Sequence, residues 1–266
     1  MLAQRATTDQ IHKGADLNST LALRVWLYTV APHELSMVVV GGATRLTDSG
    51  LSITEWLPLL GAIPPLSNED WLVAFEKYKQ IPEYHLVNKG MSLAEFQFIY
   101  WWEWAHRFLG RFIGLAFALP LAVFWLSGKI PRNVTMKLLG ILALGGLQGF
   151  FGWHMVQSGL SERVDVSHYR LALHLTTAFI ILAAILWVAF ELARQDGGEH
   201  IRLQTLSSAQ TQTAWVILAL VLIQVVMGAF VAGLKAGLVH NTWPLMNGAL
   251  LPSDLADLTP WYMNIF

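Results

Sequence analysis

The sequence contains no cysteine, and only 13% of its 266 residues are charged. Without cysteine the chain has no disulfide bonds, thiolate metal sites or c-type haem attachment. The low charge, the 55% hydrophobic content and the mean hydropathy of +0.47 disfavour an ordinary soluble domain and indicate a membrane protein. The net charge of −1 gives no electrostatic basis for binding nucleic acid.

The first twenty residues lack the apolar stretch that a secretory signal peptide contains. We therefore expect no cleaved leader, and residues 1–20 are predicted to form a cytoplasmic tail. Targeting to the membrane is then left to the apolar segments that follow.

Five stretches are long and apolar enough to cross a bilayer, which takes roughly 20 residues. They are 21–42, 107–127, 136–153, 171–193 and 213–233. The first contains Pro32, His33 and Glu34, which would kink a helix and put two ionisable groups at mid-depth. Either those groups face a polar cavity or the span is distorted. The sequence thus predicts an all-α, polytopic membrane protein.

Basic residues near the ends of the predicted spans indicate how the chain is oriented. They are Arg5, Lys13, Arg24, Lys129, Arg132, Lys137, Arg194 and Arg202. All of them fall on one side of a five-span arrangement, and the positive-inside rule makes that side cytoplasmic. The N-terminus is then cytoplasmic and the segment 43–105 is an outer loop.

This outer loop is too long to lack secondary structure. Residues 67–70 open an amphipathic run through Lys79, and Ser92 and Glu95 have the spacing of a capping box. We therefore expect two short helices on the outer surface, covering whatever lies between the spans.

The ends of the first and fifth predicted spans repeat each other. GGATRLTDSGLSITEW at 41–56 aligns without a gap with GAFVAGLKAGLVHNTW at 228–243, an offset of 187 residues. We interpret this as an internal duplication rather than a chance likeness of glycine-rich helix ends. Residues 21–193 would then form one four-helix transmembrane bundle, and residues 194–266 a linker and the first helix of a second bundle.

The stretch EFQFIYWWEWAHRFLGRFIG, at 95–114, carries the main site candidate. Its tryptophan and tyrosine rings are typical of a membrane interface, so His106 is predicted to lie just inside one. His106, Gly110 and Gly114 are spaced by four and share a helical face, where two glycines leave room for a broad planar ligand. The alternative is a hydrogen-bonded histidine on a glycine packing seam.

His174 opens the fourth span at a depth comparable to that of His106, because both spans run in the same direction. Two neutral imidazoles on facing helices can be the axial ligands of a haem iron near the outer face. His174 could instead only hydrogen-bond a neighbouring helix.

Charged residues surround this predicted haem site. Arg107, Arg111 and Arg170 are placed to meet haem propionates, since arginine suits carboxylates. Glu103 precedes His106 by three residues on the same face, and could act as a base, hold a water molecule or stabilise positive charge. It could equally be an ordinary interfacial glutamate.

Five fragments together resemble the haem A synthase family, in particular its cysteine-free alphaproteobacterial and mitochondrial branch. They are GGATRLTDSGLSITEW, EFQFIYWWEWAHRFLGR, MVQSGL, HYRLALHL and NTWPLMNG. The resemblance runs from about residue 24 to residue 252, nearly the whole chain.

The resemblance implies an inner-membrane enzyme that oxidises a methyl group of haem O to formyl, giving haem A for cytochrome oxidase. It implies two pseudo-symmetric four-helix halves, with His106 and His174 holding the substrate haem and Glu103 as the catalytic glutamate. Because the chain ends before the second histidine pair, we expect it to lack the last three spans and the second half's haem b site. Haem O synthase and oxidase assembly proteins are the implied partners.

The sequence departs from the family in two further places. Pro32, His33 and Glu34 replace an apolar run, and His154 and His240 stand where the family has aromatic residues. A bis-histidine membrane cytochrome that passes electrons without modifying haem is the main alternative, and a haem-free interaction or transport protein a more distant one. The electron donor, the oxygen source and homo-oligomer formation stay open.

Overall fold

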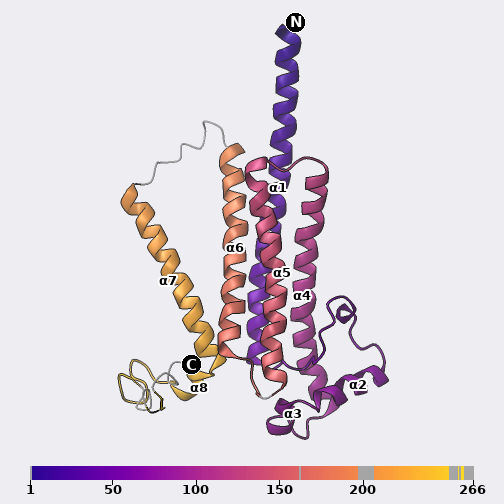
Figure 1. Cartoon of the computed structure of the whole chain (residues 1–266), viewed down its shortest axis with the longest axis vertical. Coiled ribbons are helices and arrows are strands. Elements are labelled where there is room, and N and C mark those ends of the chain that lie inside the picture. Colours follow the sequence, from indigo (N-terminus) through magenta and orange to yellow (C-terminus); the bar gives the residue numbers. More distant parts are fainter. Residues whose placement is uncertain (1, 162, 197–206, 252–256, 258, 261–266) are drawn as a thin grey trace.

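The computed structural model describes residues 2–161, 163–196, 207–251, 257 and 259–260, and the side chains of all these except 2–18 and 195–196. The described part is helical and has no β-strand element (Figure 1). Its elements are α1 (Leu2–Leu46), the 3₁₀ turn η1 (Leu60–Ala62), α2 (Asn68–Tyr78), α3 (Pro82–Leu86), α4 (Leu93–Leu126), α5 (Arg132–Leu160), α6 (His168–Asp196), α7 (Ser208–Gly233) and α8 (Ala236–Val239).

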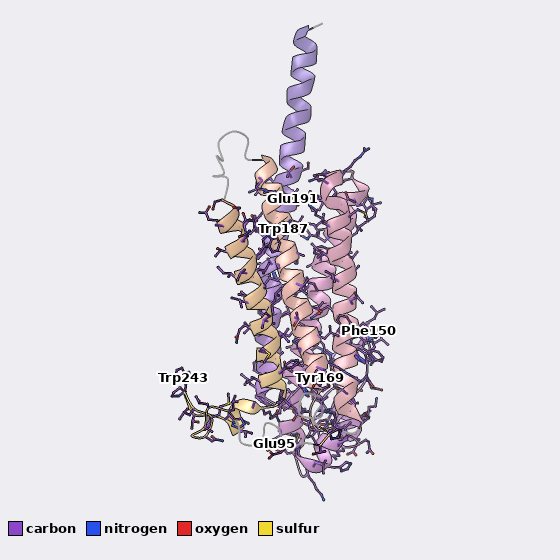
Figure 2. All side chains as sticks on the ribbon, turned by 60° about the vertical axis from the view of Figure 1, so that its left-hand side comes forward. Glu95, Phe150, Tyr169, Trp187, Glu191 and Trp243 are labelled. Carbon is purple, nitrogen blue, oxygen red and sulfur yellow. The ribbon has the colours of Figure 1, made fainter. Side chains whose placement is uncertain are left out.

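Four helices of the described part are long and apolar enough to cross a membrane: α4, α5, α6 as far as Arg194, and α7. They confirm four of the five predicted spans and the all-α, polytopic membrane class. Large apolar side chains such as Phe150 project outward from the bundle (Figure 2), as expected for a surface that faces lipid.

The first predicted span differs from the other four. Helix α1 does not meet the same criterion of apolar composition, because Pro32, His33 and Glu34 interrupt its apolar run. It nevertheless continues through Pro32, where Ser36 Oγ donates to the Pro32 carbonyl at 2.8 Å and His33 Nδ1 lies 2.7 Å from the Thr29 carbonyl. The expected tail 1–20 is part of the same helix from Leu2 onward, and α1 extends beyond the bundle (Figure 1).

Helices α1, α4, α5 and α6 form a four-helix bundle. Helix α1 packs on both α4 and α6, and α5 packs extensively on α6 but only lightly on α4. Helices α4 and α6 therefore lie diagonally across the bundle. Helix α7 packs on α6 from outside and diverges from it towards its N-terminal end (Figure 1).

Helices α2 and α3 cover one end of the bundle, which we call the cap end (Figure 1). The capping box predicted at Ser92 and Glu95 is present, but it opens α4 itself. The second predicted surface helix and the second predicted span are thus one continuous helix.

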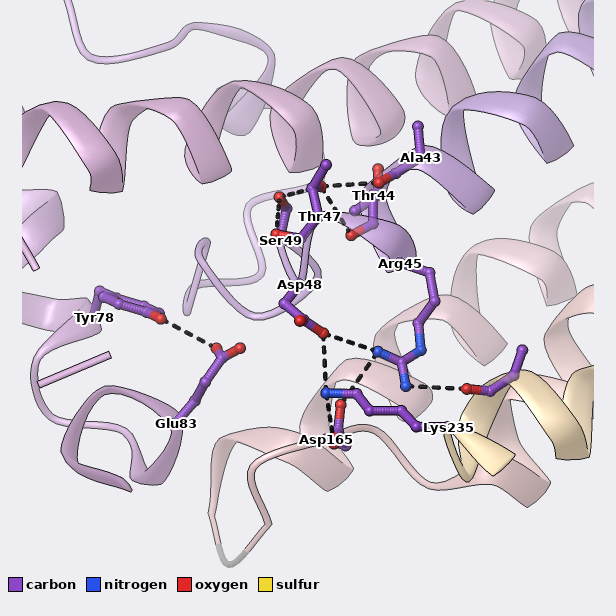
Figure 3. Close-up of polar contacts among 11 residues, drawn as sticks. Ala43, Thr44, Arg45, Thr47, Asp48, Ser49, Tyr78, Glu83, Asp165 and Lys235 are labelled. Carbon is purple, nitrogen blue, oxygen red and sulfur yellow. Dashed lines mark hydrogen bonds and ion pairs between the residues drawn. The ribbon is translucent and has the colours of Figure 1, made fainter. Parts of the chain in front are cut away.

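The cap contains a buried carboxylic acid, Glu83 of α3. Tyr78 donates a hydrogen bond to Glu83 Oε2 at 3.3 Å (Figure 3), and Asn88 Nδ2 donates to the Tyr78 hydroxyl at 2.7 Å. Burial, opposed by the hydrogen bond from Tyr78, raises the pKa of Glu83 to about 8. Burial also raises the pKa of Tyr78, so burial favours the neutral form of both groups.

We expect the cap to lose stability as the pH rises from about 4.5 to about 8. A raised pKa means that the folded cap binds more protons than the unfolded chain in this window, so its free energy of unfolding falls with pH by a few kcal/mol, at about 1.4 kcal/mol per pKa unit. Hydrogen exchange of residues 68–88 at pH 5, 6.5 and 8 measures this fall in the free energy of unfolding. Glu83→Gln should make that free energy nearly independent of pH over this range. An unchanged pH dependence in the variant would assign the effect to another group.

The ends of α1 and α7 meet in a cluster of charges at the cap end (Figure 3). Arg45 contacts Asp48 at 3.1 Å and Asp165 at 3.3 Å, and Lys235 contacts the same two carboxylates at 3.1 and 3.4 Å. The cluster ties α1 to the connection between α5 and α6 and to the start of α8.

Two contacts in this region join positions that are 187 residues apart. Arg45 Nη2 donates to the Ala232 carbonyl at 3.1 Å, and Lys235 pairs with Asp48. Asp48 and Lys235 also share a left-handed backbone, with φ of 48° and 51°. When two duplicated units are related by a twofold axis, equivalent residues of the two units meet close to that axis. The division into units 21–193 and 194–266 stays a prediction, which these contacts favour.

Candidate functional site

A cavity of about 700 Å³ lies between α1, α4, α5 and α6, and both His106 and His174 line it. Its size is that of a pocket for a large organic ligand. Because α4 and α6 are diagonal, the two histidines come from opposite corners of the bundle.

Each imidazole ring packs against a glycine of a neighbouring helix. A Cβ atom on Gly41 of α1 would lie 2.9 Å from His106 Cε1, and one on Gly152 of α5 would lie 3.0 Å from His174 Cε1. Real Cβ atoms essentially never approach as closely as 2.9 Å, so glycine at Gly41 lets the His106 ring take its place beside the helix backbone.

The Nδ1 atoms of His106 and His174 are buried and have no hydrogen-bond partner in the described part of the chain. A buried polar atom without a partner is costly, so both rings are suited to a ligand that the cavity holds. No group of three or more His, Cys, Asp or Glu side chains able to hold a metal ion occurs among the described residues. A haem iron, which brings four porphyrin nitrogens of its own, would need only such a pair of side chains from the protein.

Small residues on several helices contribute to the cavity wall. Gly110 and Gly114 of α4 and Ala178 of α6 line it, on the same faces as the two histidines. Sequence reasoning missed the opposite wall, where α5 contributes Gly145, Gly146, Gly149 and Gly152. Four glycines within the span 145–152 were the available signal.

Glu103 is buried, with 2% of its surface exposed, and lines the cavity. Its Oε2 accepts hydrogen bonds from Ser52 Oγ at 2.8 Å and from the Ile53 amide at 2.7 Å. Its Oε1 accepts one from Arg107 Nη2 at 2.5 Å. Both carboxylate oxygens are therefore engaged with the protein.

Arg107 and Arg111 bind the segment 52–58, which contributes Trp56 and Pro58 to the cavity wall. Arg107 donates to the Ile53 and Glu55 carbonyls at 2.7 and 2.9 Å. Arg111 donates to the Leu57 and Pro58 carbonyls at 3.0 and 2.8 Å. Both arginines line the cavity, and Arg111 Nη1 is buried without a partner, so Arg111 keeps one donor for a ligand.

Arg170 lies apart from this group. Its Nη1 donates to the His154 carbonyl of α5 at 2.7 Å, and the residue is not part of the cavity wall. Of the two ionisable groups predicted at mid-depth in the first span, Glu34 lines the cavity, whereas His33 packs on Phe112, with ring centres 5.6 Å apart.

Fold and site together define a polytopic helical membrane protein with a two-histidine cavity inside a four-helix bundle. The family model COX15-CtaA, described as cytochrome oxidase assembly protein, matches residues 24–266. The chain belongs to this family.

Relatives with the name Heme A synthase share about half of the residues. Those of Brucella ovis and Brucella abortus are each 54% identical over 244 residues, and that of Brucella anthropi is 53% identical. The alignments cover 92% of this chain but 66–67% of the relatives, so the chain spans about two thirds of their length. No solved structure matches the chain.

Proposed function

We propose that the chain binds haem through His106 and His174 and takes part in converting haem O to haem A, by oxidation of a porphyrin methyl group to formyl, for cytochrome oxidase. The observation that carries this proposal is the 700 Å³ cavity with an imidazole from each of two diagonal helices. The name of the relatives, Heme A synthase, also supports the proposal.

The cavity residues have separate roles in this proposal. His106 and His174 hold the iron, whose redox chemistry the haem supplies when bound. Arg111 offers its free Nη1 to a propionate, and Arg107 shapes the cap end of the cavity through segment 52–58. Gly110 and Gly114 leave room for the macrocycle. The role of Arg170 as a propionate ligand stays a sequence-based prediction, since its hydrogen bond goes to α5.

Location and partners follow from the same proposal. The basic residues at the far end of the bundle favour a cytoplasmic N-terminus, so the cap end and the histidine pair face outward across the inner membrane. Haem O synthase would supply the substrate, and oxidase assembly proteins would receive the product.

One observation favours a second candidate, a bis-histidine cytochrome that only passes electrons. Glu103, the predicted catalytic carboxylate, has both oxygens engaged by Ser52, Ile53 and Arg107. A general base must reach the proton that it removes, so in this arrangement Glu103 would first have to release a partner.

The absorption spectrum and extracted haem of the protein, purified from cells that produce haem O, separate the two candidates. Bound haem O, with formation of haem A, supports the proposed conversion. Haem b alone supports the electron carrier. A folded protein without a Soret band contradicts both.

The glycine beside His106 gives a sharp local test. Gly41→Ala should weaken haem binding by roughly tenfold, because the new methyl group displaces the His106 ring. The matched control is Gly42→Ala, whose Cβ would meet nothing within 4 Å. Haem titration followed at the Soret band measures both, and equal affinities would show that the ring position tolerates the change.

A further inference from the structure

The connection between α1 and α2 contains an apolar loop, which we define as residues 56–66, WLPLLGAIPPL. Apart from the indole nitrogen of Trp56, none of its side chains carries a polar atom. Most of its large side chains are nevertheless exposed, namely Trp56, Leu57, Leu59, Leu60, Ile63 and Leu66. Leu59 and Leu66 expose 85% and 79% of their surface. A continuous apolar surface of this kind marks contact with a partner or a membrane.

The carbonyl groups of this loop are paired, although its backbone is largely irregular. The Leu57 and Pro58 carbonyls accept hydrogen bonds from Arg111, at 3.0 and 2.8 Å. The next two carbonyls, of Leu59 and Leu60, accept from the amides of residues 62 and 63 in the 3₁₀ turn η1, at 3.2 and 3.1 Å. Leaving a carbonyl unpaired in a lipid environment is costly. These hydrogen bonds therefore remove one obstacle to placing the loop against lipid.

The loop lies beside the part of α4 that enters the membrane. The turn η1 packs on α4, and Figure 1 shows the connection between α1 and α2 rising beside α4 before it returns to α2. Arg111 lies seven residues beyond Trp104 of the aromatic belt, which is about 10 Å further along the helix. Because Arg111 binds the loop, the loop belongs at the level of the membrane interface.

Charged residues mark the water-facing side of the same region. Glu55 directly precedes the loop and pairs with Lys77 of α2 at 2.7 Å, and both side chains are about half exposed. Ser67, which follows the loop, caps α2. The loop is thus an apolar excursion between two polar ends, and its exposed side chains continue the lipid-facing surface of α4, where Phe108 and Phe112 are exposed.

We propose that the apolar loop inserts its side chains into the headgroup–acyl boundary of the leaflet at the cap end, and that lipid is its partner. Amphipathic segments that lie in a membrane interface bury their apolar side chains at this boundary. Trp56 and Pro58 of the same loop line the cavity, so contact with lipid would hold this part of the cavity wall in place. The inference depends on the position of α4 in the membrane and not on a bound haem.

The absence of cysteine makes a direct measurement of depth possible, because an introduced cysteine is then the only labelling site. A nitroxide label is attached to Leu60→Cys or Leu66→Cys, and the protein is placed in vesicles of phosphatidylcholine and phosphatidylglycerol. Relaxation of the label is measured with oxygen, which concentrates among the acyl chains, and with a water-soluble nickel complex. The ratio of oxygen to nickel accessibility should be roughly tenfold higher than at the control Glu69→Cys. Glu69 is an exposed residue of α2 in the same cap.

Two results would overturn the proposal. If the labels at positions 60 and 66 are as accessible to nickel as the label at position 69, the loop lies in water. If they are shielded from both oxygen and nickel, a protein surface covers the loop in place of lipid. The same measurement on His106→Ala, which lacks one histidine of the proposed haem site, should give the same ratio as the protein with both histidines. A ratio that falls to the control value in this variant would contradict the independence from haem.

Discussion

Replacing either His106 or His174 with alanine should abolish haem retention by the purified protein. His106 and His174 are the two histidines in the described lining of the cavity, which offers no third imidazole to take the place of either. Changes to groups that merely support a metal ligand cost 10–100-fold in affinity, so loss of a ligand itself should exceed about 100-fold.

The control for this experiment is His154→Ala. His154 stacks on Phe150, with ring centres 6.0 Å apart, and is not part of the cavity wall, so its loss should leave haem binding unchanged. Adding free imidazole to His106→Gly or His174→Gly should restore part of the Soret band, because the vacated space admits the missing ring. Normal haem content in both alanine variants would remove the site assignment.

The second large effect is expected at Glu103. Glu103→Ala should retain haem but form no haem A, and it should also destabilise the protein by about 3–5 kcal/mol. The loss of stability follows because Arg107, with a side chain only 10% exposed, would keep its charge without its partner, and the Ile53 amide would lose its acceptor.

Glu103→Gln separates chemistry from anchoring. The amide can still accept hydrogen bonds from Ser52 and Ile53, but it can neither take up a proton as a carboxylate does nor pair with Arg107 as an ion. If Glu103 is catalytic, this variant forms no haem A at any level of folded, haem-loaded protein. If Glu103 only anchors segment 52–58, Glu103→Gln forms as much haem A per folded protein as the wild type. Unaltered haem A formation in both Glu103→Ala and Glu103→Gln would leave Glu103 with a packing role alone.

The sequence could predict those features that depend on neighbouring residues. Apolar length identified four spans, and the capping residues at Ser67 and Ser92 marked two helix starts where the structure has them. The spacing of His106, Gly110 and Gly114 put them on one face, and all three line the cavity. These are properties of helical periodicity and of local hydrogen bonds, which a sequence contains directly.

The partners of the charged residues could not be predicted, because they depend on how distant segments meet. Arg107 and Arg111 looked like propionate ligands, yet most of their donors bind carbonyls of segment 52–58, some fifty residues earlier in the chain. Arg170 was grouped with them by position along its span, but helix rotation turned it towards His154.

The sequence by itself therefore determined an all-helical membrane protein with two histidines near the ends of two of its spans. Only the tertiary structure decided that α4 and α6 are diagonal, that Gly41 and Gly152 seat the two rings, and that glycines of α5 line the cavity. The physical reason is that helix periodicity fixes which face a residue occupies, whereas the packing of one helix on another fixes what that face meets.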